Sequence, residues 1–423
     1  MRKRYSVPKQ ILVETVNIQQ MKKNSKTRYI VLLSLLILVV VAAISLPRLF
    51  KSEKRGLSGE SRQSGGIDLS EYPTLESFER AERDDIISSY SDTMPVYGNW
   101  KSYTMKDGLP SDKCYTVRID GDRVLVGTHD GLAVLEKGKW RTYTTEDGLA
   151  HNGVVSIDVS ALTGDVWLAT LGGLNRWSGG KFETFTQFNS GMPNDLVYNV
   201  FCYGKDIWVA TGGGAGVYDT NKKDWKIFTE MNAPMHEPWT YALTAGDGKV
   251  WIAAWGGGVI EYNMQTEQFR DYVDPDGFME IDLLPDDGLI HDITTATAYS
   301  DSILWVSTYF GMSRYDGKNW NGYFDHDSGL AGNFINFVRA EGPVVFVCSD
   351  KGLSSFNGKT WITYKKNDEK PDGKALVYRG ARVVKEIPLT PSISHNYVIG
   401  VDAEDDVLWV ATSSGVSRGE RIN

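Results

Sequence analysis

The chain of 423 residues contains few cysteines and none of the short motifs that usually mark an active site. Its three cysteines, Cys114, Cys202 and Cys348, form neither a C-x-x-C pair nor a zinc-like spacing, so buried free thiols are expected. There is no Walker loop, dinucleotide fingerprint, nucleophile elbow or metalloprotease helix. We therefore predict no cofactor, no catalytic residue and a protein that is not an enzyme.

Basic residues are scarce outside the N-terminus. Residues 1–55 hold 12 Lys/Arg against Glu14 and Glu53, while the whole chain carries a net charge of −9, so the remainder is strongly acidic. An acidic domain repels phosphate backbones. Nucleic acid is therefore excluded as a partner.

One long uncharged run is present at residues 29–46, where 13 side chains are Leu, Ile or Val. As a helix it covers roughly 27 Å, enough to cross the hydrocarbon core of a membrane. Basic residues precede it and no A-x-A-like cleavage site follows, which favours a retained anchor with a cytoplasmic N-terminus over a cleaved signal peptide.

The predicted order along the chain follows from this anchor. We expect a basic cytoplasmic tail at 1–28, a transmembrane helix at 29–47, a flexible linker with room for a short helix at 48–98, and one exported domain at 99–423. The prediction is a single-pass protein of the cytoplasmic membrane with a periplasmic or extracytoplasmic domain.

The exported part is built from seven repeats. Each has an aromatic residue followed three positions later by another, at Trp100/Tyr103, Trp140/Tyr143, Phe182/Phe185, Trp225/Phe228, Phe269/Tyr272, Trp320/Tyr323 and Trp361/Tyr364. Inside each unit an apolar strand ends in a small residue before glycine. One position of that strand is Trp167, Trp208, Trp251, Trp305 or Trp409, with Leu125 and Phe346 in the other two units.

These repeats predict an all-β fold, a seven-bladed β-propeller of four-stranded blades, with the tryptophans packed between neighbouring sheets. The last unit lacks an outer strand and the first begins with an orphan one at 100–104. We predict that these two segments pair to close the ring, because a propeller must hide its free edges.

The signatures Asp147-Gly148-Leu149, Trp167 to Thr170 and Gly173-Leu174-Asn175-Arg176 resemble the two-component regulator propeller repeat, over about residues 97–423. In that family such repeats usually form the extracytoplasmic sensor of a histidine kinase. The resemblance implies ligand sensing, and because no kinase or receiver domain follows the repeats here, signalling would need a separate histidine kinase or envelope partner.

Two insertions and a repeated polar position suggest where a site would lie. The insertions, at 271–289 and 365–394, are predicted as long loops on one face of the ring. The loop entering each innermost strand carries, in order, Ser111, His151, Asn194, His236, His291, Gly332 and His395, followed in four units by Asp112, Asp195, Glu237 or Asp292. Hydrogen-bonded loop caps are favoured over a metal site, since only His236 and His291 lie on neighbouring blades.

Aromatic residues supply a second set of candidates on the same face. Trp255, Tyr309 and Phe310 replace small residues in the loop after the second strand, and could stack on a ligand or simply pack beneath the insertions. Trp239 is expected in the core. The candidate ligand-binding residues are Trp255, Tyr309, Phe310, His129, His151, His236, His291 and His395.

The predicted function is an extracytoplasmic binding module, sensory with a separate partner, for a glycan, peptide or protein. Two alternatives remain: an enzyme resembling the streptogramin lyases, which are also seven-bladed, and a purely structural envelope scaffold.

Overall fold

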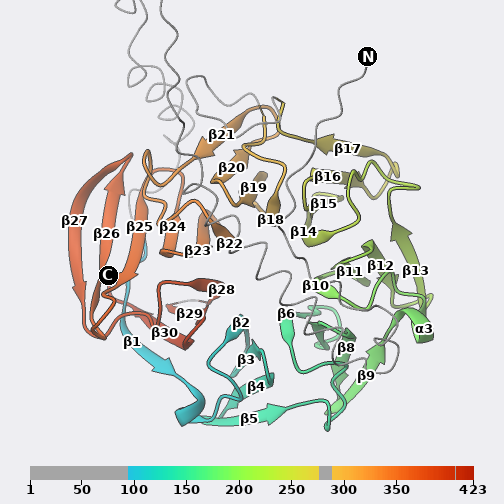
Figure 1. Ribbon diagram of the computed structural model, residues 1–423, viewed down its shortest axis with the longest axis horizontal. Coiled ribbons are helices and arrows are strands. Elements are labelled where there is room, and N and C mark those ends of the chain that lie inside the picture. Colours follow the sequence, from blue (N-terminus) through green and yellow to red (C-terminus); the bar gives the residue numbers. More distant parts are fainter. Residues whose placement is uncertain (1–93, 276–287, 405) are drawn as a thin grey trace, which may run out of the picture. The chain divides into compact units, whose positions relative to one another are not determined.

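The computed structural model describes residues 94–275, 288–404 and 406–423. The span predicted at 29–47 lies outside these residues, and among the residues described no helix is long and apolar enough to cross a membrane. Seven β-sheets surround a central axis (Figure 1), which confirms the predicted seven-bladed propeller. We number the blades 1 to 7 by their innermost strands.

All blades share the same antiparallel order from the axis outward. The innermost strands are β2 (Cys114–Asp120), β6 (Val154–Val159), β10 (Val197–Tyr203), β14 (Thr240–Gly246), β18 (Thr294–Ser300), β22 (Ile335–Glu341) and β28 (Val398–Glu404). The second strands are β3 (Arg123–Thr128), β7 (Val166–Thr170), β11 (Asp206–Thr211), β15 (Lys249–Ala254), β19 (Ile303–Thr308), β23 (Val344–Ser349) and β29 (Val407–Thr412).

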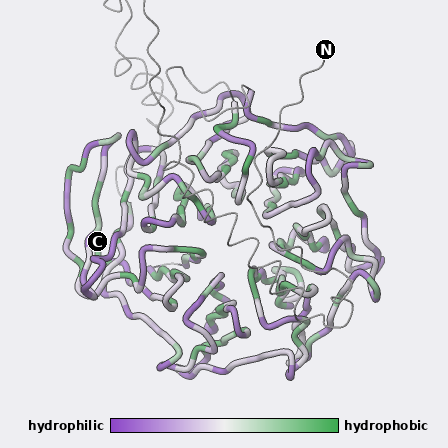
Figure 2. The backbone as a smooth tube through the Cα atoms, in the orientation of Figure 1, coloured by the Kyte–Doolittle hydropathy of each residue, from purple (hydrophilic) through white to green (hydrophobic). Residues whose placement is uncertain are grey.

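The third strands are β4 (Gly131–Glu136), β8 (Gly173–Ser178), β12 (Gly214–Asp219), β16 (Gly258–Asn263), β20 (Met312–Tyr315), β24 (Gly352–Phe356) and β30 (Gly415–Arg421). The fourth strands are β5 (Lys139–Tyr143), β9 (Lys181–Phe185), β13 (Asp224–Phe228), β17 (Phe269–Tyr272), β21 (Trp320–Tyr323), β25 (Trp361–Lys366) and β1 (Tyr97–Tyr103). The second strands are buried along nearly their whole length, as expected for sheets covered on both faces. Figure 2 shows the hydropathy along the chain.

The ring closes as predicted. Strand β1 pairs antiparallel with β30, so that the N-terminal strand completes blade 7, whose other three strands come from the C-terminus. Trp100 is 2% exposed and its ring meets Tyr364 of blade 6 edge-on, at 5.8 Å between centroids. Closure therefore fixes β1 both by backbone pairing and by aromatic packing.

Seven apolar clusters fill the seven gaps between neighbouring blades, and each contains the repeated side chain of a second strand. Trp208 of blade 3, for example, packs among Leu243, Val250 and Ile252 of blade 4. The same holds for Leu125, Trp167, Trp251, Trp305, Phe346 and Trp409. The predicted role of the tryptophans as packing between sheets is confirmed.

The small residue before glycine also has a clear physical role. Thr170 Oγ1 donates a hydrogen bond to Gly173 O, and five other blades make the same bond, from Thr128, Thr211, Thr308, Ser349 and Thr412. Gly173 has φ of +145°, and a Cβ there would lie 2.9 Å from Phe185 O. Glycine is therefore required where the third strand approaches the fourth.

Blade 6 corrects the expectation of four strands in every blade. The insertion at 365–394 is not a long loop: it adds β26 (Gly373–Arg379) and β27 (Arg382–Leu389) to the outer edge, giving a six-stranded sheet. Two consecutive residues of β26, Ala375 and Leu376, are both buried, on opposite faces of the sheet, and lie opposite Tyr364 and Thr363 of β25. Of the insertion at 271–289, residues 271–275 and 288–289 are described, and Leu289 is fully buried.

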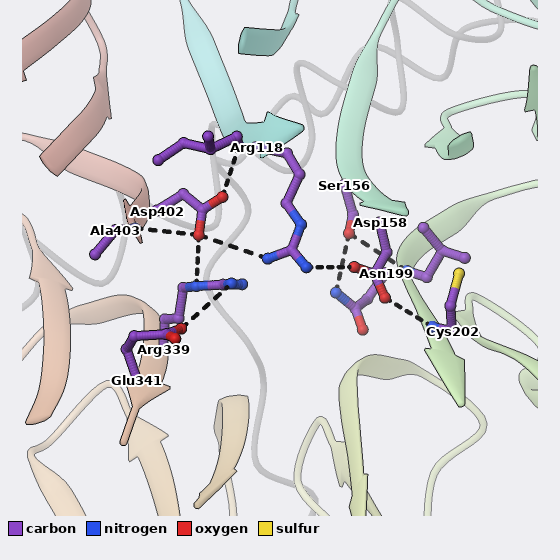
Figure 3. A network of polar contacts seen from close by, with 11 residues as sticks. Arg118, Ser156, Asp158, Asn199, Cys202, Arg339, Glu341, Asp402 and Ala403 are labelled. Atoms are coloured by element: carbon purple, nitrogen blue, oxygen red, sulfur yellow. Dashed lines mark hydrogen bonds and ion pairs between the residues drawn. The ribbon is translucent and has the colours of Figure 1, made fainter. Parts of the chain in front are cut away.

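A chain of alternating charges crosses the innermost strands of four neighbouring blades (Figure 3). Arg339 of blade 6, Asp402 of blade 7, Arg118 of blade 1 and Asp158 of blade 2 each occupy the fifth position of their strand. Asp402 Oδ1 lies 2.7 Å from Arg339 Nε and 3.5 Å from Arg118 Nη1, and Arg118 Nη2 lies 3.1 Å from Asp158 Oδ1.

Both carboxylates of this chain also accept a backbone hydrogen bond from the next blade. Asp402 Oδ2 accepts from Ile119 N, and Asp158 Oδ2 from Cys202 N, each at 2.7 Å. The side chain of Asp402 is only 3% exposed. Removing one charge from such a buried set leaves the others without compensation, which is costly.

We expect loss of the closing strand to be severe. In the full chain, Trp100→Ala should lower the free energy of unfolding by about 3–5 kcal/mol, because it empties a buried site at the blade 6 to blade 7 contact. Deletion of residues 97–103 should remove cooperative thermal unfolding. Calorimetry checks both, with deletion of 56–62 as the control; an unchanged melting curve for the 97–103 deletion would contradict the closure.

We expect Asp402→Asn to destabilise the protein by roughly 3–5 kcal/mol, because it leaves Arg118 and Arg339 facing each other without their shared carboxylate. Asp406→Asn is the matched control, since Asp406 pairs with Arg421 while its side chain is 76% exposed. Urea unfolding measures both. Equal changes in the free energy of unfolding for the two substitutions would show that the buried chain of charges stabilises the protein no more than an exposed ion pair does.

Candidate functional site

The candidate residues lie on one face of the ring. The loop into each innermost strand, which we call the entry loop, is bonded to the loop after the second strand, which we call the second loop. Six blades make the same backbone bond, in which a second-loop N–H donates to an entry-loop carbonyl: His129 to Lys113, Leu171 to Gly153, Gly212 to Leu196, Trp255 to Trp239, Asp350 to Phe334 and Ser413 to Tyr397. Together these loops form what we call the entry face.

Side-chain caps hold the entry loops in fixed shapes. Asp147 Oδ2 accepts from Thr144 N, and Asp107, Asn189, Asn232 and Asp327 accept from the equivalent backbone groups. Three of the four carboxylates predicted to follow the histidine position act in a second cap: Asp112, Asp195 and Asp292 accept from the backbone of Met105, Gln187 and Asp274. The described parts of the entry loops are therefore held in place by side-chain hydrogen bonds.

Three of the four repeated histidines are loop caps as well, as the sequence favoured. Nδ1 of His151, His291 and His395 accepts from the backbone N–H two residues later, at 2.8–2.9 Å. Asn194 makes the same bond through Oδ1 in blade 3. His236 is exposed, and His129 bonds Tyr115 Oη at 2.9 Å.

The histidines do not gather into one centre. They stand on different blades, and in the described part of the chain no three His, Cys, Asp or Glu side chains come close enough to hold a metal ion. Burial, and then the neighbouring His129, lower the pKa of His151. Burial likewise lowers the pKa of His291, so both imidazoles are neutral near pH 7.

The aromatic candidates belong to a longer row of stacked rings, which we call the aromatic arc. Trp255 meets Tyr309 edge-on at 5.2 Å between centroids, and Tyr309 stacks on Phe334 at 3.9 Å. On its other side Trp255 meets Tyr241 at 5.3 Å, and Tyr241 stacks on Tyr198 at 4.8 Å. The arc thus spans blades 3 to 6.

The arc offers neutral hydroxyl groups and ring faces. Burial raises the pKa of Tyr309 to about 12 and also raises those of Tyr198 and Tyr241. Near its blade 6 end, Asp350 Oδ1 is buried and has no hydrogen-bond partner within the described residues. Burial raises the pKa of this carboxyl. An orphaned buried oxygen beside stacked rings is typical of a place where a ligand completes the hydrogen bonding.

Phe310 does not join the arc but stacks on another candidate, His291, at 4.2 Å. One aromatic prediction needs correction. Trp239 is not a core residue: it is 38% exposed on the entry face, because Thr240 and not Trp239 holds the register position of Val154. Sequence reasoning missed Tyr198, Tyr241 and Phe334, although two of them share the second position of an innermost strand, which was a readable signal.

The cap geometry predicts how the histidines affect stability. His151→Ala should cost about 1 kcal/mol through the uncapped backbone N–H, whereas His151→Asn should cost little because Asn194 makes the same cap. Because the folded-state pKa of His151 is lowered, its contribution is complete above the ordinary histidine pKa and decreases as the pH falls below about 6.5. Urea unfolding at pH 8 and pH 5 measures this, and equal losses for Ala and Asn would contradict the cap.

No family model matches the chain, and no curated protein matches it. Solved structures do match. The extracellular domain of a hybrid two-component system from B. thetaiotaomicron superposes with a TM-score of 0.58 at 14% identity, over 77% of this chain and 42% of that one. A one-component system from the same organism gives 0.55 at 15% identity, over 79% of this chain and 43% of that one.

An enzyme shares the fold too. Virginiamycin B lyase from Staphylococcus aureus gives a TM-score of 0.54 at 13% identity, over 77% of this chain and 99% of the lyase. The chain spans less than half of the length of the two-component and one-component domains, and identities this low establish the fold alone. The resemblance to the propellers of two-component regulators, read from the repeats, is thus confirmed at the level of fold by solved extracellular domains of such systems.

Proposed function

We propose that this chain is an extracytoplasmic binding module, anchored through residues 29–47, whose entry face receives a ligand and whose signal passes to a separate partner such as a histidine kinase. The aromatic arc is the observation that carries this proposal. Rings from four blades stack in sequence on a rigid face, where packing within a single blade would not require them. Stacked rings with nearby polar groups suit glycans, peptides and protein side chains.

The fold supports the location of the site. Long or chemically distinctive loops on one rim of a rigid scaffold commonly carry function, and the caps described above supply that rigidity. The similarity in fold to extracellular domains of a two-component and a one-component system supports an exported, sensory role. No observation on the described residues favours the lyase-like alternative, because three of the histidines use Nδ1 to cap their own loops.

We expect the double substitution Trp255→Ala, Tyr309→Ala to weaken ligand binding about tenfold or more, because each lost ring contact contributes on the order of 1 kcal/mol beyond buried area. The full chain in nanodiscs is screened by thermal shift against envelope polysaccharide fragments and peptide pools. A ligand present well above its dissociation constant should raise the melting temperature by a few degrees.

The matched control is Leu162→Ala, an apolar side chain that is 66% exposed on the loop between β6 and β7, on the opposite face. Ligands that shift the wild type should shift this control equally and the double variant little. If the double variant keeps full affinity for every ligand found, the arc is not the site.

A further inference from the structure

Charge is distributed unevenly over the entry face. The entry loops of blades 2 to 5 and the second loops of blades 1 to 5 contain no lysine or arginine among the described residues. We call these loops the acidic sector; they comprise 129–130, 144–153, 171–172, 186–196, 212–213, 229–239, 255–257, 273–275, 288–293 and 309–311. Their carboxylates are Asp130, Glu146, Asp147, Asp195, Glu230, Glu237, Asp274 and Asp292.

This asymmetry is not a general property of the domain. Loops on the opposite face mix both signs: Lys137, Lys205, Lys222, Lys223, Lys318 and Lys359 lie there together with Asp122, Asp165, Asp247 and Asp301. Among the described residues, the basic side chains of the entry face lie outside the acidic sector, at Lys106, Lys113, Lys351, Lys365, Lys366 and Lys370.

Only some of these carboxylates form hydrogen bonds that stabilise the loops. Asp147, Asp195 and Asp292 cap backbone groups. Glu146, Glu230 and Glu237 are exposed, and within the described residues their carboxylates neither cap a loop nor pair with a lysine or arginine. Three unpaired negative charges therefore face solvent, one from the entry loop of blade 2 and two from that of blade 4.

Large apolar side chains are exposed in the same sector. Phe188 is 97% exposed and Met231 is 89% exposed, and they stand three residues after Phe185 and Phe228 in neighbouring entry loops. Phe188 lies in the short helix α3 (Gln187–Ser190), which a capping box between Thr186 and Asn189 fixes. The loop therefore holds the ring out in water, and exposed apolar groups rimmed by charge mark interaction surfaces.

We propose that the acidic sector is a docking surface for a lysine- and arginine-rich polypeptide segment of a partner protein. This inference rests on the proposed role of the entry face and names the chemistry of its partner. Lysine and arginine complement the unpaired glutamates, and their cationic heads also stack on tryptophan and tyrosine, which the arc supplies through Trp255 and Tyr309. Phe188 and Met231 meet apolar side chains of the same segment, a combination that a small inorganic cation would not use.

The test measures a labelled peptide of alternating Lys/Arg and Leu, with its Glu/Leu counterpart, by fluorescence anisotropy on the full chain in zwitterionic nanodiscs. The basic peptide should bind, the acidic one should not, and affinity should fall several-fold between 50 and 200 mM salt, because exposed charges are screened. The triple variant Glu146→Gln, Glu230→Gln, Glu237→Gln should lose about tenfold or more in affinity. Phe188→Ser with Met231→Ser should weaken binding without changing its salt dependence.

The control removes three exposed charges from the other side of the blades, as Asp122→Asn, Glu136→Gln and Asp301→Asn, and should bind like the wild type. Equal losses in both triple variants, or no binding of the basic peptide to the wild type, would overturn the docking surface. Neither result bears on the proposed function. That function is contradicted only if the ligands found in the thermal-shift screen bind the Trp255→Ala, Tyr309→Ala variant with full affinity. Unchanged melting curves confirm that the variants fold.

Discussion

The pairing of β1 with β30 is the constraint on which the rest of the structure depends. A ring of blades has no free edge only if its first and last strands share a sheet, and here Tyr97 to Tyr103 completes a blade whose other strands lie some 300 residues later. Each apolar cluster lies between two blades, so each blade depends on both neighbours. The closing blade therefore supplies the contacts that its two neighbours, blades 6 and 1, need on that side.

The chain of charges near the axis reinforces the same place. It runs from blade 6 through blade 7 to blades 1 and 2, so that it crosses both sides of the closing blade. Its carboxylates also accept backbone N–H groups from the next blade, which ties the innermost strands together independently of the apolar clusters. Apolar packing and buried charge thus act at different radii of the same ring.

A rigid ring makes a shared surface from loops far apart in sequence. The aromatic arc joins residues from Tyr198 to Phe334, and the acidic sector joins loops from residue 129 to residue 311. Capped entry loops keep these groups in place, so little ordering would be needed when a partner binds. The two features overlap at Trp255 and Tyr309, which makes the entry face of blades 3 to 5 the centre of the proposed interaction.

The sequence by itself determined the number of blades, the closing strand, the packing role of the tryptophans and the cap role of three of the four repeated histidines, because each shows in the local signatures repeated along the chain or in the unit that lacks one. It did not determine the hairpin β26–β27, the exposure of Trp239, or the meeting of Tyr198, Tyr241 and Phe334 with Trp255 and Tyr309. The first two depend on which residues pair within one sheet, and the last depends on which residue of one blade comes opposite which residue of the next. Only the closed ring fixes how the residues of neighbouring blades meet, since no local sequence pattern records the register between separate sheets.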